Sequence, residues 1–266
     1  MMDNLVDLES EKIKAIIHKI KSDPEPDHIK RDELEMWQTV KRHNDEGRRV
    51  GLGLLGLGDV FAMLGLSYAC RKSIEIAETI AQTIKLSAYR ASVDMAKELG
   101  HFKCYDSKLE ATHPFIQLIA EEEPELYKDM LKYGRRNIAL TTVAPTGSIS
   151  LLTRTTSGIE PLFASTYTRR KKIQGTDETA DFVDKEGVAW KNFTVVHPQL
   201  ALWSKITGET DLSKSPYAGS TADAIDWTDR VKLQAAVQKH VCSSISSTVN
   251  LPSFIVTGKQ IGRAHV

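Results

Sequence analysis

Hydrophobic residues recur every three or four positions over the first 22 residues, which is the spacing of one face of an amphipathic helix. The apolar positions of this stretch are Leu5, Leu8, Ile13, Ile16, Ile17 and Ile20. Two prolines follow at once, in the run Ser22-Asp23-Pro24-Glu25-Pro26, and predict a loop. A second, more polar helix is expected to end near Gly47. Residues 1–46 are therefore predicted to form a helical N-terminal segment.

A longer apolar stripe with helical spacing follows in the middle of the chain. Its members are Ala77, Ile80, Ala81, Ile84, Ala88, Ala91 and Met95. Gly100 is the expected C-terminal stop of this helix, because glycine readily adopts the left-handed backbone that ends helices. Another helix is predicted over residues 114–133, before Gly134.

Two short apolar runs rich in β-branched residues predict buried strands at residues 137–143 and 245–251. The first leads straight into the turn Ala144-Pro145-Thr146-Gly147, and the second ends at Pro252. A helix is expected over residues 223–240, with Ser220 as its cap. Helices that alternate with short buried strands predict an α/β fold.

The region between residues 174 and 219 is rich in turn residues, and its hydrophobic residues follow neither a helical nor a strand spacing clearly. Trp190, Phe193 and Trp203 are its expected core anchors.

The composition narrows the classes of function. The chain has 266 residues, and its 35 basic residues balance 35 acidic ones, so no long-range field draws it to nucleic acid or to an anionic membrane. Cys70, Cys104 and Cys242 are too widely spaced for a metal or redox motif, and we interpret Cys70 and Cys104 as buried structural thiols. His197 and His240 are isolated in the sequence. Without an export signal at its start, the protein is expected to be cytoplasmic.

The stretch GLGLLGLGDV places Gly51, Gly53 and Gly56 at the spacing of a dinucleotide-binding turn. Such a turn needs a preceding strand and an acidic residue about 20 positions later, and neither is convincing here. We therefore favour a scaffold role, in which the small residues let this segment lie close to a neighbouring backbone. A nicotinamide-dependent oxidoreductase stays as an alternative.

The predicted strand 137–143 and the Pro145-Thr146-Gly147-Ser148 corner form the most informative segment. A buried strand followed by a small polar turn can aim backbone amides and hydroxyls at an anion. Gly147 permits close contact, and Thr146 and Ser148 add hydroxyl donors. The turn is thus a candidate diphosphate site, although taken alone an ordinary Pro-Thr-Gly turn explains it too.

Four short motifs in order resemble the ribonucleotide reductase large chain, in its adenosylcobalamin-dependent class II branch. They are Arg48-Arg49-Val50-Gly51-Leu52-Gly53 with Gly56-Leu57-Gly58-Asp59, Ala144-Pro145-Thr146-Gly147-Ser148-Ile149-Ser150, Ser157-Gly158-Ile159-Glu160-Pro161 with Phe163 and Tyr167, and Ser244-Ile245-Ser246 with Thr248-Val249-Asn250-Leu251-Pro252. The oxygen-dependent class I branch typically has Ala-Ser-Thr in place of Gly147-Ser148-Ile149, which favours class II. One departure is Ser247, where the family usually has lysine.

The resemblance implies part of a ten-stranded α/β barrel that reduces the 2′-hydroxyl of a ribonucleoside diphosphate or triphosphate, for deoxyribonucleotide synthesis. It implies adenosylcobalamin as the cofactor that generates a cysteine thiyl radical, and a thioredoxin-like reductant for the full enzyme. The substrate phosphates would lie against a loop formed by Pro145, Thr146, Gly147, Ser148 and Ile149.

The family's radical cysteine lies in an Asn-x-Cys-x-Glu loop, and no such string occurs in this chain. We therefore expect residues 47–257 to be the C-terminal part of a reductase barrel, inactive alone and completed by a missing half in the same or a separate chain. Residues 258–266 do not continue the pattern, so they are assigned to a tail of uncertain origin. The alternatives are a class I large-chain fragment and a non-catalytic helical interaction protein.

Overall fold

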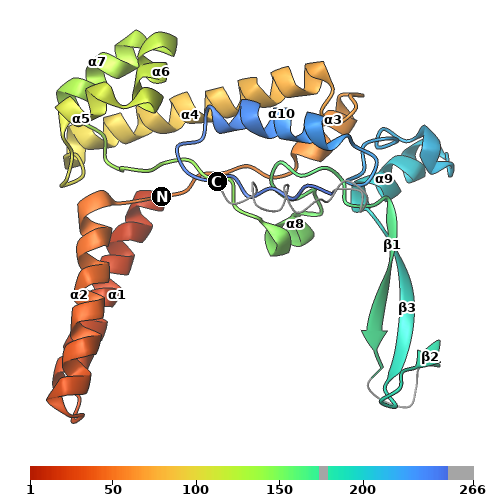
Figure 1. Cartoon of the computed structure of the whole chain (residues 1–266), viewed down its shortest axis with the longest axis horizontal. Helices are drawn as coiled ribbons and strands as arrows, with labels where there is room; N and C mark the ends of the chain where they lie inside the picture. The colour runs from red at the N-terminus through yellow and green to blue at the C-terminus, as the bar shows by residue number, and fades with distance from the viewer. Residues whose placement is uncertain (174–178, 251–266) are drawn as a thin grey trace, which may run out of the picture. The chain divides into compact units, whose positions relative to one another are not determined.

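The computed structural model of the chain describes residues 1–173 and 179–250 (Figure 1). Two compact units share the sequence. The first comprises Met1–Gly53, Ala77–Ala144 and Ala235–Ile245, and the second comprises Leu54–Ile76, Pro145–Gln234 and Ser246–Val266. The predicted tail 258–266 lies outside the described residues, as does the end of the predicted strand 245–251.

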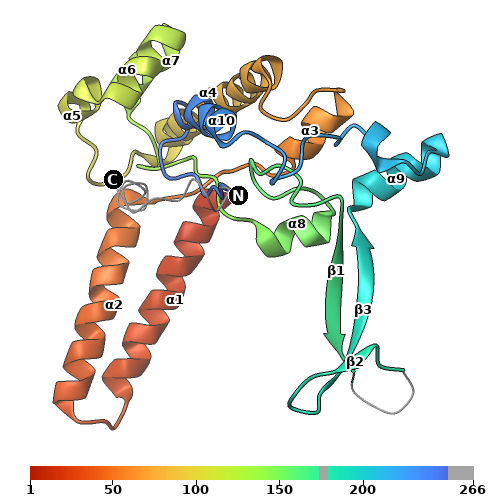
Figure 2. The same ribbon diagram turned by 45° about the vertical axis from the view of Figure 1, so that its right-hand side comes forward.

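Two antiparallel helices open the first unit, as the sequence predicts: α1 (Met2–Ser22) and α2 (Asp27–Gly47) run side by side (Figure 2). The buried apolar residues of α1 are Val6, Ile13 and Ile20, which recur every seven positions. Leu5 and Leu8 lie on the exposed face of α1 instead. The inward face is thus narrower than the apolar stripe in the sequence, as expected for a helix that contacts one partner helix.

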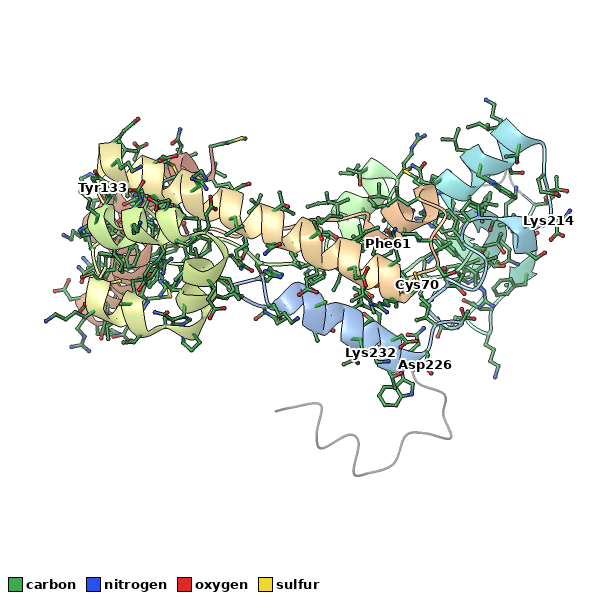
Figure 3. All side chains as sticks on the ribbon, turned by 90° about the horizontal axis from the view of Figure 1, so that it is seen from above. Phe61, Cys70, Tyr133, Lys214, Asp226 and Lys232 are labelled. Atoms are coloured by element: carbon green, nitrogen blue, oxygen red, sulfur yellow. The ribbon has the colours of Figure 1, made fainter. Side chains whose placement is uncertain are left out.

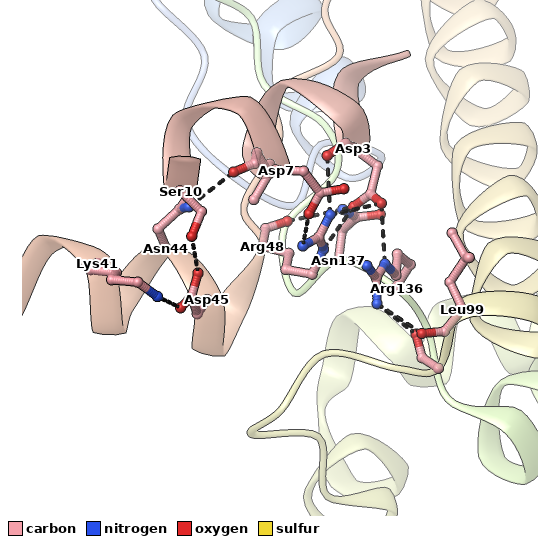
Figure 4. A network of polar contacts seen from close by, with 12 residues as sticks. Asp3, Asp7, Ser10, Lys41, Asn44, Asp45, Arg48, Leu99, Arg136 and Asn137 are labelled. Carbon is pink, nitrogen blue, oxygen red and sulfur yellow. Dashed lines mark hydrogen bonds and ion pairs between the residues drawn. The ribbon is translucent and has the colours of Figure 1, made fainter. Parts of the chain in front are cut away.

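A buried ion cluster ties the ends of these helices to residues 136 and 137 (Figure 4). The carboxylate of Asp3 accepts hydrogen bonds from Arg48 Nε at 2.9 Å, Asn137 Nδ2 at 2.9 Å and Arg136 Nε at 3.1 Å. Burial by itself raises the pKa of Asp3, but these donors outweigh it and lower the pKa below its ordinary value. The cluster therefore holds Asp3 as an anion.

The long helix α4 (Arg71–Leu99) is present and ends before Gly100, whose φ of 81° confirms the predicted left-handed stop. Its buried face includes Ala77, Ala81 and Tyr89, whereas Ala91 of the predicted stripe is exposed. Lys85 also lies on this face and is fully buried, which the apolar pattern did not predict.

Lys85 is paired with the carboxylate of Glu122, which also accepts a hydrogen bond from Gln82 Nε2 at 2.9 Å. Burial lowers the pKa of Lys85, and the ion pair with Glu122 opposes that shift. A charged residue is tolerated on the buried face of α4 because its counter-ion lies beside it.

The single helix predicted over residues 114–133 is wrong, because the chain forms two helices there. α6 (Pro114–Glu122) is capped by Glu123, and α7 (Pro124–Tyr133) begins at the next residue. Proline has no N–H to donate, so Pro124 ends one helix and occupies the first position of another. A short helix, α5 (Ser107–Thr112), precedes them. The core of this region consists of Tyr89, Val93, Ile116, Ile119, Leu126, Met130 and Leu140.

The predicted strands 137–143 and 245–251 appear only as isolated parallel bridges, which pair Leu52 with Thr141 and Val143 with Ile245. A β-carbon added to Gly53 would lie 2.3 Å from the carbonyl oxygen of Thr142. The prediction that the glycine stretch lies close to a neighbouring backbone is therefore confirmed, and its reason is steric.

The second unit contains α3 (Leu57–Met63), α8 (Gly147–Thr153), α9 (Pro198–Thr207), the 3-10 helix η1 (Leu212–Lys214) and the start of α10 (Trp227–Gln238). Strands β1 (Thr166–Lys172), β2 (Phe182–Val183) and β3 (Ala189–Val196) form one antiparallel sheet in the order β1-β3-β2, with Thr166 opposite Val196. A small core joins Ala62, Leu162, Leu200 and Tyr217, and Trp203 packs against it as predicted.

Two predictions for this unit are wrong. Phe193 is an exposed residue of β3 rather than a core anchor, because no side chain of β1 or β3 is fully buried. Helix α10 begins at Trp227 rather than at residue 223. Its cap is Asp226, marked in Figure 3, whose Oδ1 accepts the Thr228 N–H at 2.7 Å. Ser220 is buried and accepts the Tyr68 N–H instead.

Candidate functional site

The predicted phosphate-binding turn leads into α8, and its backbone takes an uncommon shape. Thr146, the residue before the helix, has φ of 51° and ψ of 22°. For a β-branched residue this left-handed conformation is a genuine outlier, and such strain concentrates at functional sites. Thr146 Oγ1 accepts the Gly158 N–H at 2.9 Å, a contact that holds the turn in place.

The first amides of α8 point out of the helix end without a side-chain cap. The N–H groups of Gly147, Ser148 and Ile149 precede the first intrahelical donor, Ser150, whose N–H reaches the Thr146 carbonyl at 2.8 Å. Apart from its chain neighbours and the backbone of α8 itself, no described atom lies within 4 Å of the position of a β-carbon on Gly147. Among the described residues these amides have no acceptor, and the turn leaves open space beside Gly147.

A cavity of about 620 Å³ opens beside this turn within the second unit. This volume lies in the range of small-molecule sites. The residues that line it are Pro145, Gly147, Ser150, Leu151, Arg154, Thr155, Thr156, Ser157, Glu160, Pro161, Leu162, Phe163, Ala164, Tyr167, Val195, Val196, His197, Pro198, Ala222, Ser246, Thr248 and Asn250. They come from α8, β1, β3, the first residue of α9, the segments that flank these elements, and the later segments at residues 222 and 246–250.

One edge of the cavity is built on Asp59, the acidic residue of the GLGD motif in α3. Its buried carboxylate accepts hydrogen bonds from the Thr156 N–H at 2.7 Å, from the Tyr217 hydroxyl at 2.7 Å and from His197 Nε2 at 2.9 Å. Burial acts to raise the pKa of Asp59, yet the hydrogen bonds lower it below its ordinary value. The interpretation of His197 as isolated is therefore wrong, because the fold brings it to Asp59.

A second carboxylate, Glu160, is also engaged. Its Oε1 accepts the Thr248 N–H at 2.8 Å, and its Oε2 lies 3.1 Å from Arg230 Nη2. The same Arg230 nitrogen donates to Ser247 Oγ at 2.7 Å. Glu160 thus lies at the cavity with its charge balanced by buried Arg230.

Arg154 is the cation of the cavity wall for which no carboxylate partner is found among residues 1–173 and 179–250. It is exposed and lies directly after α8. The cavity therefore combines neutral donors with one uncompensated positive charge, which favours an anionic ligand.

The five residues predicted to bind phosphate differ in their position relative to the cavity. Pro145 and Gly147 line the cavity, and half-buried Thr146 lies behind them with its oxygen engaged by Gly158. Ser148 and Ile149 are exposed and do not line the cavity. The structure thus brings two of the five predicted residues, Pro145 and Gly147, to the cavity wall.

None of the three cysteines is among the residues that line this cavity. Cys242 belongs to the first unit, where its sulfur accepts the N–H groups of Leu140 and Thr141, both at 3.2 Å. Cys70 is half-buried and Cys104 is exposed, so the prediction of buried thiols is wrong for Cys104.

Comparison with known proteins identifies the family. Residues 28–265 match the family model of the ribonucleotide reductase barrel domain. The chain belongs to this family, and the α/β barrel class that the resemblance predicts is thereby confirmed.

Two relatives are named as vitamin B12-dependent ribonucleoside-diphosphate reductases. The one from Mycobacterium tuberculosis (strain CDC 1551 / Oshkosh) is 31 % identical over 211 residues, which cover 77 % of this chain and 27 % of the relative. The one from Thermoplasma acidophilum is 27 % identical over 233 residues, which cover 86 % of this chain and 28 % of the relative.

A ribonucleoside-diphosphate reductase large subunit from Arabidopsis thaliana is 29 % identical over 147 residues, covering 50 % of this chain and 17 % of the relative. The chain thus spans about a quarter of the length of its B12-dependent relatives.

No helix among the described residues is long and apolar enough to cross a lipid bilayer.

Proposed function

We propose that this chain is part of an adenosylcobalamin-dependent ribonucleoside-diphosphate reductase and holds the phosphates of the ribonucleotide substrate. The contact surface is the turn of Pro145, Thr146, Gly147, Ser148 and Ile149 with the first amides of α8. The radical cysteine, the thioredoxin-like reductant and the remainder of the barrel are supplied from elsewhere in the assembly. The chain's own task is to bind and orient the substrate.

The observation that carries this proposal is the combination of unpaired amides and open space at one helix end. A phosphate oxygen accepts hydrogen bonds from backbone N–H groups at such an end, and the helix dipole adds favourable charge. Gly147 leaves room for close approach. The names of the relatives supply the diphosphate and the B12 dependence.

We assign no residue of this chain to adenosylcobalamin. The cavity of about 620 Å³ has the volume of a site for a nucleotide-sized molecule. No group of three His, Cys, Asp or Glu side chains in the described part of the chain is arranged to hold a metal ion. The cofactor supplies the radical that starts the reduction.

The test is a substitution that fills the open space without disturbing the fold. In Gly147→Val, the new side chain has no described atom within 4 Å of its β-carbon, so we expect an unchanged melting temperature. Affinity for ADP, measured by calorimetry on the 266-residue chain, should fall at least tenfold because the valine occupies the space of a phosphate.

The matched control is Ala201→Val, which adds the same branched side chain to an exposed position of α9 outside the cavity. It should bind ADP like the wild type. Wild-type protein that does not bind ADP at millimolar concentration, or equal affinity in Gly147→Val, overturns the proposal.

A further inference from the structure

Arg154 has a backbone conformation that its side chain disfavours. It follows the last residue of α8 with φ of 59° and ψ of 43°, in the left-handed region. Glycine adopts this conformation at no steric cost, whereas a residue with a β-carbon is strained there. Backbone strain that persists at the edge of a cavity suggests that the Arg154 side chain has a functional role.

The backbone of Arg154 has structural partners. Its N–H donates to the Ser150 carbonyl, which completes the end of α8, and its carbonyl accepts Gln199 Nε2 at 3.2 Å. A glycine would make the same two contacts, because both involve main-chain atoms only. The structural role of this position therefore gives no reason for an arginine.

The guanidinium group has no hydrogen bond or ion pair to any residue that the structure describes, although it lines the cavity. The carboxylate and the imidazole of the wall, Glu160 and His197, have side-chain partners. Glu160 is paired with Arg230 at 3.1 Å, and His197 donates to buried Asp59 at 2.9 Å. An anion in the cavity would meet Arg154 as a free cation.

We propose that Arg154 is the positive charge that binds the diphosphate of the substrate, an inference that rests on the proposed function of this cavity. The turn at the other end of α8 offers only neutral donors, and these leave most of the charge of a diphosphate uncompensated. A guanidinium binds phosphate oxygens by two parallel hydrogen bonds, which makes arginine the side chain suited to this task.

Because α8 separates the turn from Arg154, the backbone amides of the turn and the Arg154 side chain would contact different phosphates of the ligand. Seven residues at roughly 1.5 Å each separate the turn from Arg154 by about 10 Å. In this proposal the amides of Gly147 and its neighbours bind one phosphate, and Arg154, which lines the same cavity, binds the other. A diphosphate therefore gains more from Arg154 than a monophosphate does.

Substitution by glycine separates a binding role from a structural one, because the two roles predict opposite effects. Arg154→Gly removes the backbone strain, so its melting temperature should equal or exceed that of the wild type. Its affinity for ADP should fall about tenfold, its affinity for AMP should fall less, and the salt dependence of ADP binding should weaken. Arg154→Gln should show the same loss of affinity without the gain in stability.

The matched control is Arg169→Gln, which removes one exposed positive charge from β1, outside the cavity wall. It should leave the binding of ADP unchanged. If Gly147→Val loses ADP binding while both Arg154 variants bind like the wild type, the inference is overturned and the proposed function stands. If the wild type does not bind ADP, both fail.

Discussion

Three donors converge on the carboxylate of Asp59, and they come from distant parts of the sequence. Thr156, His197 and Tyr217 lie 97, 138 and 158 positions away along the chain. A single sequence gives no signal for such contacts, because helical and strand periods report only local geometry. The GLGD motif marked Asp59 as part of a family pattern, but its partners became visible only in the fold.

Replacement of this carboxylate should destabilise the second unit. In Asp59→Asn the charge is lost, and the amide N–H₂ that replaces one carboxylate oxygen faces at least one of the three donors. We expect the free energy of unfolding at pH 7 to fall by about 2 to 3 kcal/mol, the range for hydrogen bonds to a buried charged group. Urea denaturation measures this loss, and Asp229→Asn, in an exposed pair with Lys232, should change stability by less than about 0.5 kcal/mol.

Asp59 should also make the stability of the protein depend on pH under acidic conditions. The pKa of Asp59 is lowered in the folded protein, so its contribution to stability is fully present above the unfolded pKa of about 3.9. That contribution is lost as the pH falls through the folded pKa. Between pH 5 and pH 3 the wild type should therefore lose more stability than Asp59→Asn, and equal losses would contradict the role of the carboxylate.

At the scale of elements, the helices were the most predictable part of the fold. The apolar spacing predicted α1, α2 and α4, because each has a continuous inward face longer than three turns. Pro124 has no N–H to donate, which predicts a helix start at this residue. The apolar pattern continues across Pro124, so the pattern alone predicted one helix where the structure has two. The strands were less predictable, because isolated bridges depend on segments far apart in the chain.

Helix α10 offers a direct comparison of the predicted and the observed start. Asp226→Ala removes the side chain that accepts the Thr228 N–H and should lower the free energy of unfolding by about 1 kcal/mol. Asp223→Ala, at the predicted start, loses only an exposed hydrogen bond to Thr221 and should cost less than about 0.5 kcal/mol. Equal losses in the two variants would contradict a start at Trp227.

At the scale of the whole molecule, the order of four motifs in the sequence was enough to identify the family. The full set of residues around the cavity could be found only from the folded structure. The turn at Pro145 and Gly147 could be predicted because a family motif contains it and because proline and glycine fix its shape. Arg154 could not, because nothing in a linear pattern shows that its backbone is left-handed or that its charge lacks a partner. Both facts depend on the end of α8 and on the cavity wall.

Each of the two compact units contains a buried aspartate that accepts hydrogen bonds from three residues, Asp3 in the first and Asp59 in the second. In the described residues the two aspartates share no hydrogen-bond partner. Substitutions at sites without shared partners usually have additive effects on stability, within about 0.5 kcal/mol.

A double-mutant cycle tests this independence. Asp3→Asn and Asp59→Asn should each lower the free energy of unfolding by about 2 to 3 kcal/mol, and the double variant should lose the sum of the two. Urea denaturation of the four proteins gives the coupling energy. A coupling above about 1 kcal/mol would show that the two aspartates stabilise a common structure, because independent sites do not couple that strongly. A coupling near zero would show that each aspartate stabilises its own unit.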